Sequence, residues 1–175
     1  MSNKRIFWTT ASVVVALDVA TKIIIQHTLT YLEPRPIIGD VVRFTLVYNK
    51  GAAFSMSLGE QSRWLFGLFA FIALVILWRL YRQGPPHDRA RALALGLAWG
   101  GAAGNLIDRI RESRGVVDFI DVGVGTVRFW TFNVADSAVT VGAILLAWVL
   151  WHEDRRLATR RTTPRSDRAE EQIGT

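Results

Sequence analysis

Four long apolar runs alternate with polar stretches along the 175 residues of the chain. The runs cover about 6–25, 64–80, 90–107 and 134–151. Each approaches the length of about 20 residues that an α-helix needs to cross the hydrocarbon core of a bilayer. The pattern therefore predicts an all-α membrane protein with four transmembrane helices, built as one domain over residues 1–151.

The polar stretches between the runs predict a small extracytoplasmic β-sheet. Residues 41–48, 116–120 and 126–132 are rich in β-branched and aromatic residues, which predicts three short strands. The first strand lies in a loop, 27–61, that is too long to be a bare connector. Residues 152–175 are charged and have few large apolar side chains, so we expect a basic, disordered tail.

The positions of Lys and Arg predict how the chain is oriented. Twelve of these residues lie at the N-terminus, between the second and third runs, and in the tail, against seven in the other two loops. Because cytoplasmic segments carry the excess of positive charge, we expect both termini in the cytoplasm. The net charge of +6 then reflects topology and anionic lipid, and not nucleic-acid binding. The first run has no clean cleavage site, so we expect a retained anchor.

Charged and amide residues occur inside or beside the apolar runs, where burial is costly unless they have a role. In the predicted topology they all lie at the outer ends of helices or in outer loops. The set is Asp18, Lys22, Asn49, Asn105, Asp108, Arg109, Asp118, Asp121, Asn133 and Asp136. Residues with unrelated structural roles would not share one membrane depth, so the pattern predicts a site at the outer interface.

Several members of this set also have a structural explanation when each is taken alone. Asp18 and Lys22 are four residues apart on one helix face and can form a self-sufficient ion pair. Asn49 precedes Gly51 in a predicted turn, where an Asn is common. Asp136 opens the fourth run, and an acid is a normal residue in a first helical turn.

The third run has a structural explanation of its own. Gly96, Gly100 and Gly104 are spaced four apart on one face, which lets another helix backbone approach closely. Packing alone explains these glycines. Asp108 and Arg109 at the end of the run can cap the helix and anchor it at the interface.

The available reactive groups narrow the chemistry. The chain has no Cys and its three His are scattered, which argues against a thiol or Ser–His nucleophile and against a His-based metal site. Two carboxylates that share a proton can activate water, as in aspartic proteases. Carboxylates can also relay protons or bind Mg²⁺, which leaves a transporter, a metal-dependent lipid phosphatase and a non-catalytic assembly factor as alternatives. The absence of an inverted repeat weighs against the transporter.

Five motifs resemble those of the prolipoprotein signal peptidase family, signal peptidase II. They are LDVATK (17–22), NKGAAFS (49–55), GGAAGNLIDR (100–109), VVDFID (116–121) and FNVADS (132–137), in the family's order. The resemblance implies an endopeptidase of the bacterial inner membrane with its active site at the periplasmic face. Its substrates would be precursors with diacylglycerol on the lipobox cysteine, cut just before that cysteine, and globomycin would inhibit it.

By position in these motifs, the resemblance assigns the catalytic pair to Asp118 and Asp136. The supporting, substrate-binding set that it implies is Asp18, Lys22, Asn49, Gly51, Asn105, Asp108, Arg109 and Asn133. Asp121 lies three residues beyond Asp118 in an extended segment, so we expect its side chain to point elsewhere. We expect no metal and no cofactor, a monomer, and membrane lipids and lipid-modified precursors as partners.

Overall fold

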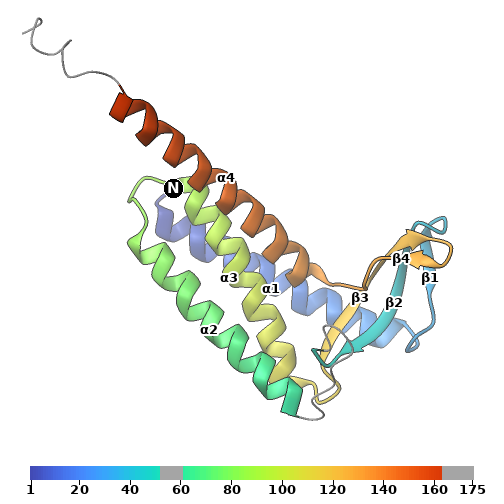
Figure 1. Cartoon of the computed structure of the whole chain (residues 1–175). Helices are drawn as coiled ribbons and strands as arrows, with labels where there is room; N and C mark the ends of the chain where they lie inside the picture. The colour runs from blue at the N-terminus through green and yellow to red at the C-terminus, as the bar shows by residue number, and fades with distance from the viewer. Residues whose placement is uncertain (52–60, 163–175) are drawn as a thin grey trace, which may run out of the picture.

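The structure, a computed structural model, describes residues 1–51 and 61–162. Four helices form a bundle, and a small β-sheet stands beyond one end of it (Figure 1). The helices are α1 (Asn3–Thr28), α2 (Gln61–Gln83), α3 (Arg89–Arg111) and α4 (Val134–Thr162). We call the end of the bundle beside the sheet the sheet end, and the end where α1 begins the N-terminal end.

Three of the described helices have the length and apolarity to cross a membrane, namely α1, α2 and the Val134–Arg155 part of α4. They confirm the prediction of a multi-pass membrane protein. α3 does not reach this apolarity, so a fourth span remains a prediction. The physical reason lies in its neighbours: α3 packs against α1, α2 and α4, so protein covers much of its surface and Gly and Ala suffice there.

The neighbouring helices approach α3 at its glycines. A methyl group placed on Gly100 would lie 2.8 Å from the carbonyl oxygen of Ala11 in α1. One placed on Gly101 would collide with the carbonyl oxygen of Ala135 in α4. Residues without a side chain allow this spacing. The glycines therefore set how closely α1 and α4 approach α3, and with it where their polar side chains meet.

The sheet is antiparallel and has its four strands in chain order. They are β1 (Arg35–Ile38), β2 (Val42–Asn49), β3 (Val116–Val124) and β4 (Val127–Arg128). The strands predicted at 41–48 and 116–120 are confirmed, and they pair with Val47 opposite Asp118. β1 was not predicted, because Pro36 argues against a strand; as an edge strand it tolerates the proline.

The strand predicted at 126–132 is wrong for most of its length. β4 has two residues, and beyond it Phe132 makes an isolated bridge to Ile120 of β3. Phe129 and Trp130 between them are exposed. The chain must leave the sheet edge here because α4 begins at Val134. The segment therefore forms a connection to α4 and not a strand, despite its β-branched and aromatic residues.

An apolar cluster fastens the sheet to the bundle. Ile25 near the end of α1 packs with Leu46 of β2 and with Val117 and Phe119 of β3, and all four side chains are buried. Burial of large apolar side chains is the main stabilising term available to such a small sheet. The cluster holds β3 against the bundle, so that Asp118 lies beside the helix ends.

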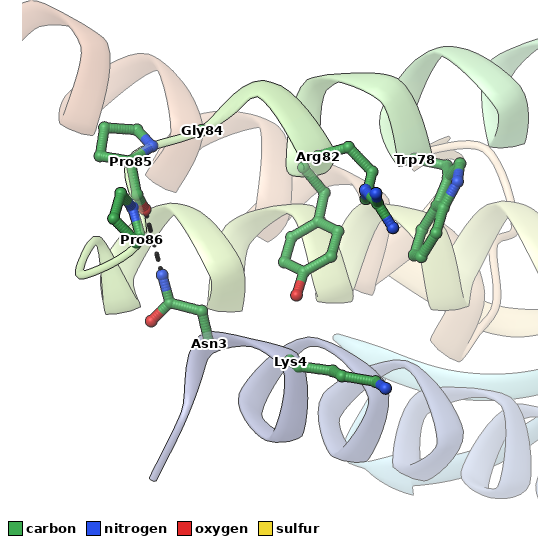
Figure 2. A pocket seen from close by; sticks show the side chains of 8 residues that line it. Asn3, Lys4, Trp78, Arg82, Gly84, Pro85 and Pro86 are labelled. Atoms are coloured by element: carbon green, nitrogen blue, oxygen red, sulfur yellow. Dashed lines mark hydrogen bonds between the residues drawn. The ribbon is translucent and has the colours of Figure 1, made fainter.

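Aromatic side chains fill the N-terminal end. Phe7 of α1 is fully buried, and its ring stacks on Tyr81 of α2 with centroids 4.2 Å apart. Trp99 of α3 lies 6.1 Å from the same ring. The side-chain amide of Asn3 donates a hydrogen bond of 3.2 Å to the carbonyl oxygen of Pro85, which ties the start of α1 to the α2–α3 linker (Figure 2).

α4 continues past residue 151 to Thr162. The prediction of a disordered tail from His152 is therefore wrong for residues 152–162. This stretch has no Gly or Pro and is rich in helix formers, and the first proline, Pro164, follows the helix end. Residues 163–175 lie outside the described part of the chain.

Candidate active site

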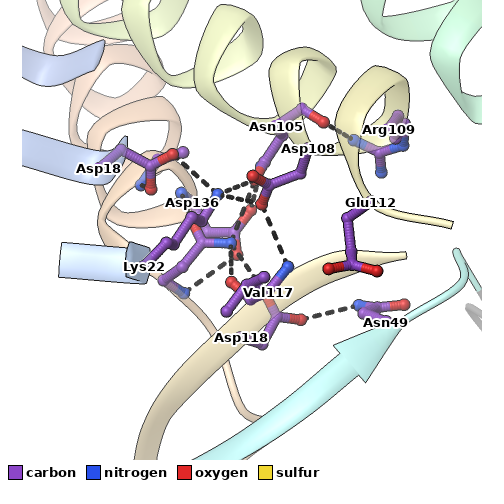
Figure 3. Close-up of polar contacts among 12 residues, drawn as sticks. Asp18, Lys22, Asn49, Asn105, Asp108, Arg109, Glu112, Val117, Asp118 and Asp136 are labelled. Atoms are coloured by element: carbon purple, nitrogen blue, oxygen red, sulfur yellow. Dashed lines mark hydrogen bonds and ion pairs between the residues drawn. The ribbon is translucent and has the colours of Figure 1, made fainter. Parts of the chain in front are cut away.

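The sheet end brings the predicted polar residues together (Figure 3). They reach this point from both sides of the sheet–bundle junction. α1 carries Asp18 and Lys22, β2 ends at Asn49, α3 carries Asn105, Asp108 and Arg109, β3 carries Asp118, and α4 is preceded by Asn133 and carries Asp136. The residues are distant in sequence, so their meeting is a product of the helix packing described above.

Lys22 is the charged centre of one half of this site and is only 2 % exposed. Its Nζ lies 2.7 Å from a carboxylate oxygen of Asp18 and 2.7 Å from one of Asp108. It also donates a hydrogen bond of 3.1 Å to Oδ1 of Asn105. The Asp18–Lys22 pair predicted on one face of α1 therefore exists, but it is not self-sufficient, because α3 supplies two of the three partners.

Each acid beside Lys22 also binds a backbone N–H of another element. Asp18 Oδ1 accepts from the N–H of Ala135 in the first turn of α4, at 2.9 Å. Asp108 Oδ2 accepts from the N–H of Val117 in β3, at 3.1 Å. Carboxylates are strong acceptors for such N–H groups. Lys22 and its two acids thus connect α1, α3, α4 and β3 at one point.

Asn105 connects Lys22 to Asp136 through hydrogen bonds. Its Oδ1 accepts from Lys22 and, at 3.1 Å, from the side chain of Asn133. A lysine ammonium can only donate, which fixes the orientation of the Asn105 amide. The amide nitrogen must then face outward, and it donates a hydrogen bond of 2.7 Å to Oδ1 of Asp136. The backbone oxygen of Asn105 accepts from Arg109 Nη1 at 2.9 Å.

Asn133 and Asp136 form a reciprocal cap at the start of α4. The N–H of Asp136 donates to Oδ1 of Asn133 at 2.9 Å, and the N–H of Asn133 donates to Oδ2 of Asp136 at 3.2 Å. This is the geometry of a capping box. The helix-start explanation of Asp136 is therefore correct, and it leaves Oδ1 of the same carboxylate to Asn105.

Asp118 is 2 % exposed and accepts from two amide side chains. Asn133 Nδ2 donates to its Oδ1 at 2.7 Å, and Asn49 Nδ2 donates to its Oδ2 at 3.0 Å. Asn49 is oriented by the N–H of Gly51, which donates to Asn49 Oδ1 at 2.8 Å. Asn49 thus has both roles that the sequence allowed, as a turn residue and as a partner of the site.

Asn133 joins the two candidate catalytic carboxyl groups. Its side-chain nitrogen binds Asp118, while its backbone N–H and side-chain oxygen bind Asp136. Asn133 itself is fully buried. The spacing of Asp118 and Asp136 is therefore set by one rigid residue at the start of a helix.

The surroundings of the two acids differ. Burial raises the pKa of Asp118 to about 7, and the charge of Asp136 adds to the rise, against the hydrogen bonds from Asn49 and Asn133. Asp136 is half-buried and accepts N–H donors on both oxygens. With a pKa of about 7, Asp118 can keep its proton near neutral pH.

Asp121 points away from this pair, as predicted. Its Oδ1 lies 2.5 Å from Arg128 Nε, and its Oδ2 accepts from Thr45 at 3.2 Å. Neither partner was singled out in the sequence. The signal was available in the alternation of β3, which places residues three apart on opposite faces, and in the lone arginine of the 126–132 segment.

Within residues 1–51 and 61–162, no group of three or more His, Asp or Glu side chains is arranged to hold a metal ion. The carboxylates of the site face ammonium and N–H donors.

A cavity of about 100 Å³ lies beside the site. Its lining includes Lys22, Asp108 and Gln26.

Residues 10–152 match the family described as signal peptidase (SPase) II. The lipoprotein signal peptidase of Cupriavidus taiwanensis is 45% identical over 139 residues, covering 78% of this chain and 77% of that protein. That of Geobacter metallireducens is 38% identical over 155 residues, covering 88% and 95%. A bacterial membrane enzyme solved by the in meso method at 2.3 Å resolution aligns with a TM-score of 0.74 and 32% identity, covering 83% of this chain and 87% of that one. The chain belongs to the signal peptidase II family.

Proposed function

We propose that this protein is an aspartic endopeptidase that removes the signal peptide from diacylglyceryl-modified prolipoproteins, just before the lipidated cysteine. The main support is that Asn133 is hydrogen-bonded to both Asp118 and Asp136. The chain also belongs to the signal peptidase II family. Relatives named as lipoprotein signal peptidases support the choice of substrate.

One carboxyl group acts as general base and the other as general acid in the hydrolysis. Asp136, as the carboxylate, takes a proton from water, and the water oxygen bonds to the scissile carbonyl carbon. Asp118, as the acid, donates to the carbonyl oxygen as negative charge develops there. When the C–N bond breaks, the proton held by Asp136 passes to the leaving amine of the cysteine. One hydroxyl of the tetrahedral intermediate returns its proton to Asp118, which leaves a carboxyl group on the released signal peptide. No other reactant is consumed.

The other polar residues keep these two in place. Lys22 fixes the amide of Asn105, which in turn orients Asp136. Arg109 acts electrostatically on both Asp118 and Asp136. Among the described residues, one of its N–H groups donates a hydrogen bond, to the backbone oxygen of Asn105. Its remaining N–H groups are available to bind a carbonyl oxygen of the substrate. Globomycin would inhibit by occupying the same place.

The membrane placement forms part of the proposal. Both termini lie in the cytoplasm, α3 is a fourth span, and the sheet end faces the outer side of the bacterial inner membrane. Single cysteines at Val127, which is 80% exposed, and at His87 test this in a chain without other cysteines. An impermeant thiol reagent applied to intact spheroplasts should label position 127 and not 87. The reverse pattern would move the site to the cytoplasmic side.

Cleavage of a lipidated precursor by purified protein, followed as a gel shift, tests the catalytic pair. Asp118→Asn and Asp136→Asn should each lower turnover about 10²- to 10⁴-fold, the range for a lost general acid or base. The double variant should be little worse than either single one, because the two act as a unit. Asp121→Asn is the matched control, since it alters a buried acid of the same strand outside the pair, and it should retain most activity.

EDTA should leave the turnover of the unchanged protein unaffected. Inhibition by the chelator would indicate a metal-dependent hydrolase. Near-normal cleavage by either single Asn variant, in protein shown to be folded, would remove the aspartic mechanism while leaving the family membership intact.

A further inference from the structure

A second cavity lies at the N-terminal end, at the opposite end of the bundle from Asp118 and Asp136. It has a volume of about 330 Å³, far more than the roughly 10–15 Å³ that a single water needs. The start of α1, the end of α2 and the α2–α3 linker line it (Figure 2). We call it the basic aromatic cavity, after Lys4, Trp78, Tyr81 and Arg82 in its wall.

The wall of this cavity is well supported. The Asn3–Pro85 hydrogen bond holds the start of α1 against the linker, across the cavity. Deeper in the bundle, Phe7 stacks on Tyr81, and Trp8 lies 5.5 Å from Trp78 between ring centroids. Aromatic pairs at such distances prefer defined geometries, so they add rigidity as well as buried area.

Two cations line the cavity, and none of the acids in residues 1–51 and 61–162 pairs with them. Lys4 and Arg82 both line it, and both are exposed. None of the ion pairs found among the described residues involves either of them, and the lining includes no Asp or Glu. The Arg82 guanidinium carbon lies 5.8 Å from the centre of the Trp78 ring, which holds it on the α1 side of α2.

The position of the cavity along the helices indicates the ligand. It lies where α2, the most apolar of the described helices, ends and the polar linker begins. Trp, Tyr, Lys and Arg together are typical of the bilayer–water interface, the depth of lipid phosphates. Ammonium and guanidinium groups bind phosphate oxygens by charge-assisted hydrogen bonds. Lipid headgroups supply the phosphate groups found at this depth. A soluble phosphate ester is the alternative source, which the experiment below distinguishes.

We propose that the basic aromatic cavity binds the phosphate of an anionic glycerophospholipid. Lys4 and Arg82 contact the phosphate, and Asn3 and Tyr81 offer further hydrogen-bonding groups in the wall. The acyl chains stay in the bilayer beside Trp8 and Trp78. Bound lipid connects α1 with the end of α2 and so stabilises this end of the bundle by mass action. The site does not depend on the proposed catalytic pair or on which side of the membrane it faces.

Native mass spectrometry of the full chain in neutral detergent tests the site. Phosphatidylglycerol and phosphatidylcholine with identical acyl chains are titrated separately, and the first bound lipid is counted. The unchanged protein should bind one phosphatidylglycerol about tenfold more tightly than phosphatidylcholine. Lys4→Gln and Arg82→Gln should each weaken phosphatidylglycerol binding about fivefold, as expected for one cation at a phosphate surface, and the double variant more.

Arg5→Gln is the matched control, because Arg5 is an exposed cation next to Lys4 that does not line the cavity. It should leave the affinity within about twofold. A loss equal to that of Lys4→Gln would show that attraction is diffuse and would overturn the site. Equal binding of the two lipids would do the same.

A third arm separates lipid from soluble phosphate. Glycerol phosphate at the concentration that saturates with phosphatidylglycerol should neither form an adduct nor displace the lipid. Displacement at equal concentration would assign the cavity to a soluble phosphate ester and overturn the lipid assignment. Cleavage is not used as the readout, so failure here leaves the proposed function untouched, and the reverse also holds.

Discussion

The two ends of the helical bundle join α1 and α3 in different ways, one through aromatic rings and the other through buried charges. At the N-terminal end, aromatic rings around Phe7 fill the space between α1, α2 and α3. At the sheet end, the same α1 and α3 meet through Lys22 and its acids. The buried polar and charged residues of the described chain all lie in the half toward the sheet: Asp18, Lys22, Ser62, Asp108, Asp118, Asp121 and Asn133.

The difference bears on what the buried charges contribute. Aromatic packing is sufficient to join these helices, as the N-terminal end demonstrates. Buried ion pairs often add nothing to stability relative to apolar residues of similar size. The network at the sheet end reaches Asp136 through Asn105 and Asp118 through Asn133. Holding these two carboxyl groups in fixed positions is the role that our proposal gives it. Four predictions test this contrast, beginning with the largest expected effect.

Lys22→Met removes the charge that Asp18 and Asp108 share. The free energy of unfolding should fall by about 3–5 kcal/mol, because two buried acids lose their partner. Cleavage should be lost as well, since Asn105 is no longer oriented toward Asp136. Lys4→Met is the matched change at the other end of α1, and it should cost less than about 0.5 kcal/mol. Equal effects in detergent unfolding experiments would remove the distinction between the ends.

The pH dependence of stability should reveal the buried acid of the pair. The raised pKa of Asp118, about 7, means that the folded state holds this proton more tightly than the unfolded state, whose value is near 3.8. The stabilisation is complete below about pH 4 and is lost as pH rises through 7. It amounts to at most about 4 kcal/mol, at 1.36 kcal/mol for each pKa unit.

Thermal unfolding of the unchanged protein and of Asp118→Asn between pH 5 and pH 8 measures this. The variant should gain relative stability with rising pH, because its amide cannot ionise. Cleavage by the unchanged protein should also decline above pH 7, where Asp118 loses the proton it donates. Parallel stability profiles for the two proteins would contradict the raised pKa.

Phe7→Ala should separate stability from catalysis. Removing this buried ring should cost about 3 kcal/mol, the lower part of the range for such cavities. The turnover of the folded fraction should stay within about twofold, because Phe7 lies far along α1 from Lys22. Asp118→Asn should do the opposite, with large loss of turnover and retained folding. A kcat loss in Phe7→Ala would mean that the two ends are coupled.

Substitution of the α3 glycines should have the smallest effects. The effect on cleavage should differ between a glycine near the N-terminal end and one near the sheet end. A methyl group on Gly96 would lie 2.9 Å from the carbonyl oxygen of Phe7, and one on Gly104 would lie 2.5 Å from Asp18 Oδ2. Gly96→Ala and Gly104→Ala should each cost about 1–3 kcal/mol through overpacking. Of the two, Gly104→Ala should also reduce cleavage, because it displaces Asp18.

Gly67→Ala in α2 is the control for that pair. The nearest atom to a methyl group at this position is Leu106 Cδ1, at 3.9 Å, so there is room for it. The change should be neutral or stabilising by up to about 1 kcal/mol, since Ala favours the helix over Gly. Destabilisation by Gly67→Ala as large as that by Gly96→Ala would show that close approach is not the cause.

Local patterns in the sequence were sufficient for the four helices and for β2 and β3, but not for β1 and β4. Apolar runs of membrane length correspond to α1, α2 and α4, and β-branched segments to β2 and β3. A helix or strand depends mainly on residues close in sequence, which is why these predictions hold. Helix direction and rise convert sequence position into a position along the bundle. Asp18, Lys22, Asn105, Asp108 and Asp136 accordingly meet at the sheet end. Their common depth at the outer side of a membrane stays a prediction.

The tertiary structure decided how these residues use one another. Sequence spacing paired Lys22 with Asp18, but it could not show Asp108 as the second acid, because that contact needs the close α1–α3 approach. It placed Asn133 among the supporting residues, whereas packing puts Asn133 between Asp118 and Asp136. Hydrogen-bond direction and burial depend on atoms from distant segments, so the raised pKa of Asp118 becomes visible only when β3 and α4 meet.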